Sequence, residues 1–189
     1  GDAGDGGPIF SAAPLGFEHL GLDPGQPVRI AGVAAANLSV LVAFQASDVV
    51  RWDQCEDAAA PVSFGRDRCT EVRRVLMEPK GFHAIITNDS GDNWYLNFQS
   101  SDARLLPKLK GHQIEAISWD PDSSASSTRD LLVGTERGEL VHVVVEGKER
   151  LVRPVLSFEF GGHAGAEHER RHVPICGVHR ERVMSAGDG

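Results

Sequence analysis

One stretch of the sequence has residue types and spacing that could do chemistry. His168, Glu169 and His172 form an H-E-x-x-H pattern. On an α-helix this spacing places two imidazoles one turn apart, where both can bind Zn²⁺ while the glutamate polarises the attacking water. Such a site also needs a third ligand and a helix long enough to hold the pair. A zinc-dependent hydrolase is therefore one function that the sequence allows.

The residues around this pattern do not favour a catalytic helix. Pro174 stands two residues after His172, so any helix must end there. Upstream, three glycines at 161, 162 and 165 leave at best about two turns over 164–173, which is too short to be stable alone.

A third zinc ligand is not in its usual place either. The version of the motif with a third histidine needs glycine at 175 and histidine at 178, where this chain has Ile175 and Val178. We therefore interpret 161–173 as a solvated insertion loop. A further alternative is metal trapping without function by four histidines, namely His163, His168, His172 and His179.

The rest of the sequence shows no catalytic pattern. It has no G-x-S-x-G and no phosphate-binding glycine loop. Three cysteines without C-x-x-C spacing predict neither a disulfide framework nor a cysteine zinc site. We interpret Cys176 as a small buried apolar residue. The sequence therefore assigns no catalytic, cofactor-binding or metal-binding residue and implies no cofactor.

The elements available to position any site are strands. A strand is predicted at 114–119, followed by a turn, a serine-rich loop and two β-rich runs separated by a tight turn at 136–138. Together with the pair Gly111 and His112, this order is typical of a propeller blade, in which four antiparallel strands run outward from a central channel. We expect His112 to join a hydrogen-bond network buried within its blade.

The same order of strands and turns recurs along the chain. Residues 28–53 and 72–99 repeat it. First strands are expected to begin near Val28, Val72, Ile114 and Pro174, at intervals of 44, 42 and 60 residues. The first two intervals match the roughly 40–45 residues of such blades, and the insertion accounts for the longer third.

We therefore predict an all-β fold, a partial WD-like β-propeller of about three blades plus terminal strands. The blades are expected at about 28–67, 72–107 and 114–160, with a fourth starting at 174, an insertion loop at 161–173, and a disordered tail at 1–8 ahead of the propeller at 9–189. Because propellers close with about four to eight blades, the ring is expected to be incomplete.

Three details of the blades are also predicted. Residues 62–64 are expected to be the fourth strand of the first blade, after a connector at 54–61. Residues 105–106 are expected to be the outer strand of the second. Its aromatic third strand, with Trp94, Tyr95 and Phe98, is expected to pack in the core.

Charge narrows the classes of partner. The formal net charge is −8 and the sequence pI is about 5.4, which argues against a general surface for nucleic acid or anionic membranes. No apolar run reaches the 18 or more residues of a membrane span, and residues 1–8 lack the features of a secretion signal. The chain is expected to be cytosolic.

A more specific signal lies in three stretches: LLPKLKGHQIEAISWDP at 105–121, DLLVGTERGELVHVVV at 130–145 and MEPKGFHAIITNDSGDNWYLN at 77–97. They resemble the amino-terminal propeller of the deep orange family, the class C vacuolar protein sorting subunit shared by the HOPS and CORVET tethering complexes. In that family a helical solenoid and a RING-type zinc module follow the propeller. This chain has neither, so the roles of those parts, including any ubiquitin-ligase activity, are not carried over.

From the repeats and the resemblance we expect a non-catalytic protein-interaction scaffold: the propeller of a HOPS/CORVET-type tethering subunit, acting in vesicle docking and fusion at the endosome and the lysosome or vacuole. The resemblance implies other tethering subunits and fusion machinery as partners. It also implies peripheral membrane association through the complex only, on late endosome, lysosome or vacuole. The net charge predicts no nucleic acid as a partner. The alternatives are a generic WD-repeat scaffold of another complex and a zinc hydrolase using His168, Glu169 and His172.

Overall fold

The computed structural model describes residues 30–44, 48–66, 69–160 and 171–180. Within them, three four-stranded antiparallel sheets follow one another along the chain, each with its strands in sequence order. We call them blades 1, 2 and 3. Blade 1 comprises β1 (Ile30–Ala36), β2 (Ser39–Phe44), β3 (Val49–Asp53) and β4 (Ala58–Pro61); blade 2 comprises β5 (Val72–Met77), β6 (His83–Asn88), β7 (Asn93–Asn97) and β8 (Ala103–Leu105); blade 3 comprises β9 (Ile114–Ser118), β10 (Leu131–Thr135), β11 (Glu139–Glu146) and β12 (Lys148–Ser157).

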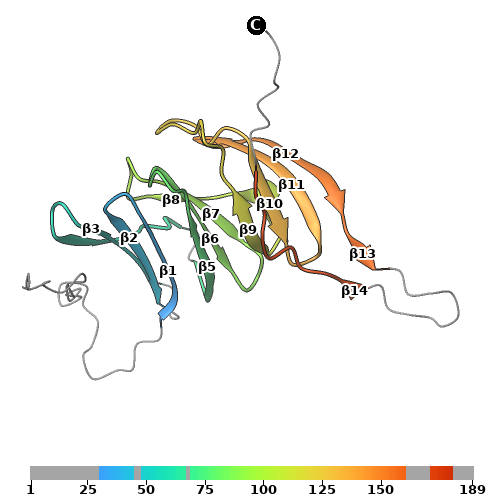
Figure 1. Cartoon of the computed structure of the whole chain (residues 1–189). Coiled ribbons are helices and arrows are strands. Elements are labelled where there is room, and N and C mark those ends of the chain that lie inside the picture. Colours follow the sequence, from blue (N-terminus) through green and yellow to red (C-terminus); the bar gives the residue numbers. More distant parts are fainter. Residues whose placement is uncertain (1–29, 45–47, 67–68, 161–170, 181–189) are drawn as a thin grey trace, which may run out of the picture.

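The three blades stand side by side in the manner of a propeller (Figure 1). The first strands of neighbouring blades contact each other, β1 with β5 and β5 with β9. The all-β fold and the partial propeller of about three blades are therefore confirmed. No described segment forms a helix of the length and hydrophobicity that crossing a lipid bilayer requires.

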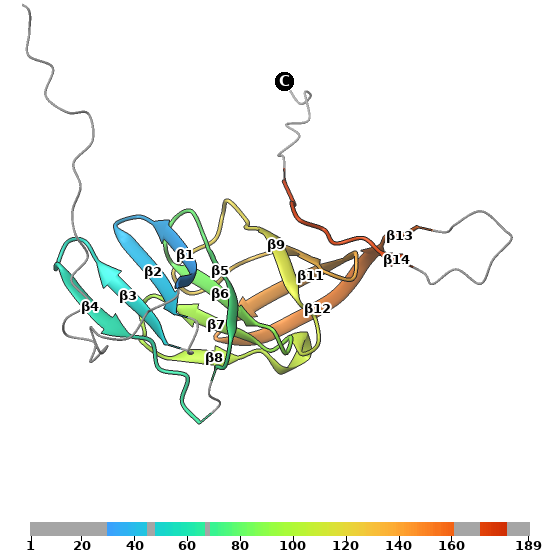
Figure 2. The same cartoon turned by 90° about the horizontal axis from the view of Figure 1, so that it is seen from below.

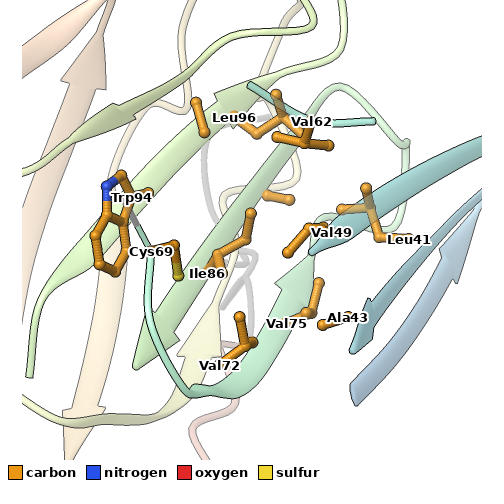
Figure 3. Close-up of a cluster of buried hydrophobic side chains, with 12 residues drawn as sticks. Leu41, Ala43, Val49, Val62, Cys69, Val72, Val75, Ile86, Trp94 and Leu96 are labelled. Atoms are coloured by element: carbon orange, nitrogen blue, oxygen red, sulfur yellow. The ribbon is translucent and has the colours of Figure 1, made fainter. Parts of the chain in front are cut away.

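Apolar residues on facing sheets hold the blades together. Between blades 1 and 2, Leu41 and Val49 pack against Ile86, Trp94 and other buried side chains (Figure 3). A second cluster joins the opposite face of blade 2 to blade 3, through Ile85, Tyr95, Val133 and Val143. Because side chains alternate across a strand, neighbouring residues such as Ile85 and Ile86 serve different interfaces. This explains why β6, a middle strand of blade 2, is buried along its whole length.

The fourth strand of blade 1 lies earlier than predicted. It is β4, not 62–64, because Asp53 Oδ1 accepts hydrogen bonds from the backbone N–H groups of Cys55 at 2.9 Å and Glu56 at 3.4 Å and so reverses the chain directly after β3. Alanine is a weak strand former, but pairing with β3 overrides that preference. Val62 is instead buried in the core, and Phe64 packs edge-on against Trp94 with ring centroids 5.7 Å apart.

The outer strand of blade 2 also differs from the prediction. It is β8, which ends at Leu105, whereas Leu106 caps a short 3₁₀ helix, η2 (Pro107–Leu109). Pro107 occupies the first turn of this helix, a position that needs no N–H donor. Leu106 and Leu109 are both buried, so η2 anchors the connection to blade 3.

A short antiparallel ladder lies at the base of the region assigned to the insertion loop. β13 (Glu159–Phe160) pairs with β14 (Arg171–His172), so two residues at the end of 161–173 are strand and not loop. Residues 161–170, and the predicted tail at 1–8, lie outside the described residues.

Residues 173–180 leave this ladder and lie along blade 3 (Figure 2, red). The N–H of Ile175 donates to the carbonyl of Thr135 at 3.0 Å, and Arg180 pairs with Asp120 at 2.8 Å. No described strand pairs with this segment, and the fourth blade expected from 174 stays a prediction. The buried position predicted for Cys176 is wrong. Ile175 packs against blade 3, and because side chains alternate in an extended chain, Cys176 points away from the blade and is exposed.

Candidate functional site

The H-E-x-x-H pattern is not presented on a helix at its described end. His172 lies in β14, where the backbone is extended, while His168 and Glu169 lie outside the described residues. The helical geometry that would put the two imidazoles one turn apart therefore does not apply to residues 171–172. Among the described residues, no group of three His, Cys, Asp or Glu side chains is arranged to hold a metal ion.

The side chains predicted to be structural are placed by blades 2 and 3. Trp94 and Tyr95 are buried, as expected for core, and Phe98 is partly buried. His112 makes a contact within its own blade, from Nδ1 to Glu139 Oε2 at 3.1 Å. Both side chains remain about a quarter to a third exposed, so this contact lies near the surface and is not the buried network that we predicted.

A buried polar network exists elsewhere, between blades 2 and 3. We call it the inter-blade cluster and define it as Glu78, His83, Tyr95 and Ser123. Ser123, in the loop between β9 and β10, donates its hydroxyl to Glu78 Oε1, at the start of the β5–β6 turn. His83 Nε2 lies 2.6 Å from the carbonyl oxygen of Ser124, and His83 Nδ1 lies 2.7 Å from the Tyr95 hydroxyl. The serine-rich loop is thus fastened to blade 2 by polar contacts.

The partners of His83 fix its proton positions. A carbonyl oxygen can only accept, so Nε2 carries the hydrogen that it donates to Ser124. In the neutral ring Nδ1 then accepts the hydroxyl hydrogen of Tyr95. The His83 ring also stacks on Tyr95 and on Trp119, with centroids 5.7 and 6.5 Å away.

The cluster contains a serine, a histidine and a glutamate, but its geometry is not that of a catalytic triad. The Ser123 hydroxyl donates to Glu78 and not to an imidazole, and both nitrogens of His83 are occupied. The exposed fractions of Glu78, His83, Tyr95 and Ser123 are 1%, 0%, 2% and 4%, which leaves no access for a substrate. The cluster therefore positions a loop.

Burial also governs the protonation of this cluster. It raises the pKa of the Glu78 carboxyl above its usual range, against the opposing effects of His83, Lys80 and two backbone N–H groups. Burial likewise raises the pKa of Tyr95 to about 12. The tyrosine is therefore a hydrogen-bond donor at every physiological pH.

The opposite ends of the blades carry a second set of polar contacts. Arg73 on β5 pairs with Glu115 on β9 at 2.7 Å and with Glu136 at 3.3 Å, and Arg74 also reaches Glu115. Asn93 is fully buried, and its amide nitrogen donates to the carbonyl oxygens of Gly91, Leu109 and His112 at 3.1, 2.8 and 2.9 Å. These contacts hold the connection between blades 2 and 3 in place.

Sequence reasoning found none of these roles. Glu78 stands in a Glu-Pro-Lys-Gly turn, where a glutamate is ordinarily solvated, and Asn93 borders a turn in the same way. They are buried by residues that are distant in the sequence and are brought close by the fold. The local sequence around Glu78 or Asn93 therefore cannot indicate this burial.

Comparison with known proteins identifies the family. The model of the Pep3/Vps18/deep orange β-propeller domain matches residues 16–185. The chain belongs to this family. The resemblance carried by 77–97, 105–121 and 130–145 is thereby confirmed for the deep orange propeller.

Three curated relatives show how much of the family this chain represents. It is 26% identical over 180 residues to the vacuolar protein sorting-associated protein 18 homolog of Danio rerio, covering 94% of this chain and 18% of the relative. It is 31% identical over 94 residues to the vacuolar membrane protein pep3 of Schizosaccharomyces pombe, and this alignment covers 46% of this chain and 10% of the relative. It is 34% identical over 76 residues to the Caenorhabditis elegans vacuolar protein sorting-associated protein 18 homolog, covering 39% and 7%. The chain spans less than a fifth of the length of each relative.

Two solved structures have distant similarity to this deep orange family chain. The β-propeller domain of Myceliophteria thermophila Cps50 (Swd1) has a TM-score of 0.43 and 16% identity, covering 68% of this chain and 42% of that structure. The N-terminal domain of Nup159 has a TM-score of 0.40 and 13% identity, covering 68% and 30%. The family model describes a β-propeller domain, and the three four-stranded sheets of this chain have that arrangement.

Proposed function

We propose that this chain is the non-catalytic propeller of a HOPS/CORVET-type tethering subunit, acting in vesicle docking and fusion at the endosome and the lysosome or vacuole. The observation that carries the proposal is the family match over 16–185. The names of the matched relatives, which refer to vacuolar protein sorting and the vacuolar membrane, support it.

The proposed mechanism is geometric. Blades held together by apolar clusters and by the inter-blade cluster present loops and sheet edges at fixed positions to partner proteins. The partners would be other subunits of the tethering complex and fusion machinery. The chain would reach late endosome, lysosome or vacuole membranes from the cytosolic side, through the complex and not by direct insertion.

The test is complementation with the complete gene product that contains this chain. In cells lacking the gene, we compare the wild type with a Leu96→Asp variant, which places a carboxylate in the core between blades 1 and 2, and with Ser126→Ala, an exposed control. We expect Leu96→Asp to reduce content mixing between purified vacuoles or lysosomes, while the control supports it fully. Normal content mixing with Leu96→Asp, at equal protein level, would contradict the proposal.

Proximity labelling separates this role from the first alternative. A labelling enzyme fused to the complete gene product should mark tethering subunits and proteins of late endosomes or lysosomes. Labelling of a different complex, with those proteins absent, would favour a generic WD-repeat scaffold.

Metal analysis addresses the hydrolase alternative. We expect the dialysed protein to retain no stoichiometric zinc, because the described end of the H-E-x-x-H pattern is a strand. Zinc retained at one ion per chain, and lost in His168→Ala, would instead support the hydrolase.

A further inference from the structure

A groove at the outer rim joins blades 2 and 3, and its lining residues are not part of the inter-blade cluster. It has a volume of about 860 Å³ and is formed by β8 and η2 on one side and by the β11–β12 turn on the other. A smaller pocket of about 210 Å³ continues from it, sharing Arg104 and Gly147, and is lined by polar side chains such as Asn97, Gln99 and Asp102. The groove is therefore extended in shape.

The charge of the groove is opposite to that of the chain. Four of its lining residues are cationic, Arg104, Lys108, Lys148 and Arg150, while the chain as a whole has a net charge of −8. The main groove has one lining carboxylate, Glu149, which is buried and already accepts the backbone N–H of Lys108 at 2.9 Å; the adjoining pocket adds the exposed carboxylate of Asp102. The groove thus concentrates positive charge on an acidic protein.

Two of these cations have defined local contacts, and Arg150 already pairs with the Glu146 carboxylate at 2.7 Å while remaining largely exposed. In the β11–β12 pairing, Val144 faces Leu151 and Val145 faces Glu149, so Arg150 is the extra residue of a β-bulge. Bulges redirect side chains at sheet edges. On the opposite wall, the Arg104 guanidinium donates to the carbonyl of Gly147 at 3.1 Å, which holds it across the groove.

Two features leave room for a chain-like ligand. Gly147 has φ +68°, and a Cβ built there would meet no atom within 4 Å, so the backbone at the turn is open to close approach. Leu105 and Pro107 add apolar surface between the cations. A ligand with carboxylates on either side of an apolar residue matches this lining.

From these observations we infer that the groove binds an extended acidic peptide segment of a partner protein. An anionic membrane is the less suitable occupant, because a plane of lipid would also face the acidic remainder of the chain, whereas a single segment within the groove lies within about one Debye length, roughly 8 Å, of the cations. The inference goes beyond the tethering role and would hold whichever complex contains the chain.

The test uses the complete gene product and a fluorescein-labelled peptide of alternating Asp and Glu around one central Leu, with binding measured by fluorescence anisotropy. The groove variant is Lys148→Glu/Arg150→Glu. The matched control is Arg66→Glu/Arg137→Glu, which changes two exposed arginines away from the groove and alters the net charge by the same amount. A milder pair, Lys148→Gln/Arg150→Gln, covers the case in which charge reversal prevents folding.

We expect saturable peptide binding that weakens as the salt concentration rises. The peptide affinity should fall by about tenfold or more in the groove variant and by less than about twofold in the control, since charge-assisted contacts act at short range. The same peptide with Asn and Gln in place of Asp and Glu should not bind. Absence of binding, equal losses in both charge variants, or binding of the neutral peptide would overturn the inference. So would groove-dependent binding to phosphatidylcholine vesicles containing phosphatidylserine without binding to the peptide.

Discussion

Ser123 of blade 3 donates its hydroxyl to the carboxylate of Glu78 in blade 2, and both side chains are buried. The two residues are far apart in the sequence and belong to turns of different blades. Their hydrogen bond therefore exists only when the blades are packed together, which makes it a measure of blade-to-blade association. Ser124 continues the same connection by accepting from His83.

Removing the Ser123 hydroxyl should weaken this association. Ser123→Ala leaves a buried carboxylate one partner short, so we expect the free energy of unfolding to fall by about 1–3 kcal/mol. Ser126→Ala is the control, because Ser126 is exposed in the same loop, and its effect should stay within about 0.5 kcal/mol. Urea denaturation of both variants measures the difference. Equal stability of the two would show that the hydrogen bond contributes nothing.

Glu78 makes stability depend on pH in a defined direction. Because its pKa is raised in the folded protein, folding favours the protonated form. Its contribution is fully present below the unfolded pKa, about 4.3, and is lost as the pH rises through the raised folded pKa. Glu78→Gln cannot titrate, so we expect its unfolding free energy, relative to the wild type, to increase from acidic to neutral pH.

The measurement is urea denaturation of both proteins across that range. Burial also raises the pKa of Glu149, but this group is present in both proteins and cancels in the comparison. A constant difference between wild type and variant at every pH would contradict the raised pKa of Glu78.

The blade order could be predicted from the sequence because turns and strand periods are local. Gly138 marks the β10–β11 turn, and the alternation in 114–119 marks a strand, as the structure confirms. The fourth strand of blade 1 could not be placed, since an alanine run becomes β4 only when the Asp53 turn brings it alongside β3.

The polar contacts were missed for a related reason. Glu78 and Asn93 lie in or next to turns, and a turn in isolation predicts solvent exposure. Their burial depends on which loop of the next blade lies over them. That information is long-range, so the groove and the inter-blade cluster become visible only in the folded chain.

Gly138 should be far less tolerant of substitution than Gly147. Both have positive φ, +75° and +68°, so alanine carries a similar backbone strain at each. At Gly138 a Cβ would also lie 2.7 Å from the carbonyl oxygen of Phe158 and 2.8 Å from that of Val173, whereas at Gly147 it meets nothing. We expect Gly138→Ala to lower the free energy of unfolding by at least about 1 kcal/mol more than Gly147→Ala does, as measured by thermal unfolding. Similar losses would mean that the segment from 173 does not lie on this turn.

Asn93 should not tolerate an isosteric acid. Its amide donates to three carbonyl oxygens, and the carboxylate of Asn93→Asp would face those same oxygens without a hydrogen, at a site that is 0% exposed. We expect Asn93→Asp to lower the free energy of unfolding by about 3 kcal/mol or more at neutral pH. Part of this stability should return at low pH, where the protonated acid donates one hydrogen bond.

Asn88→Asp is the matched control for Asn93→Asp. Asn88 is also buried, but its Oδ1 accepts from the N–H of Asp92 at 2.8 Å, and a carboxylate keeps that bond. The loss should therefore be smaller in denaturant titrations. The reverse ranking of the two variants would show that the Asn93 contacts do not hold the connection between blades 2 and 3.

The cysteines give a direct test of the packing between blades 1 and 2. Cys69 is 1% exposed in that core, and burial, with a smaller effect of the Asp92 carboxylate, raises the pKa of its thiol to about 12, whereas Cys55 and Cys176 are exposed. Because the thiolate is the reactive form, Cys69 should react with a disulfide reagent at pH 8 at least about a hundredfold more slowly than the other two. In Cys55→Ser/Cys176→Ser the remaining reaction should accelerate with urea in step with unfolding, since Cys69 is reached only by opening of the blades. Rapid labelling of that variant without denaturant would mean that blades 1 and 2 do not pack as described.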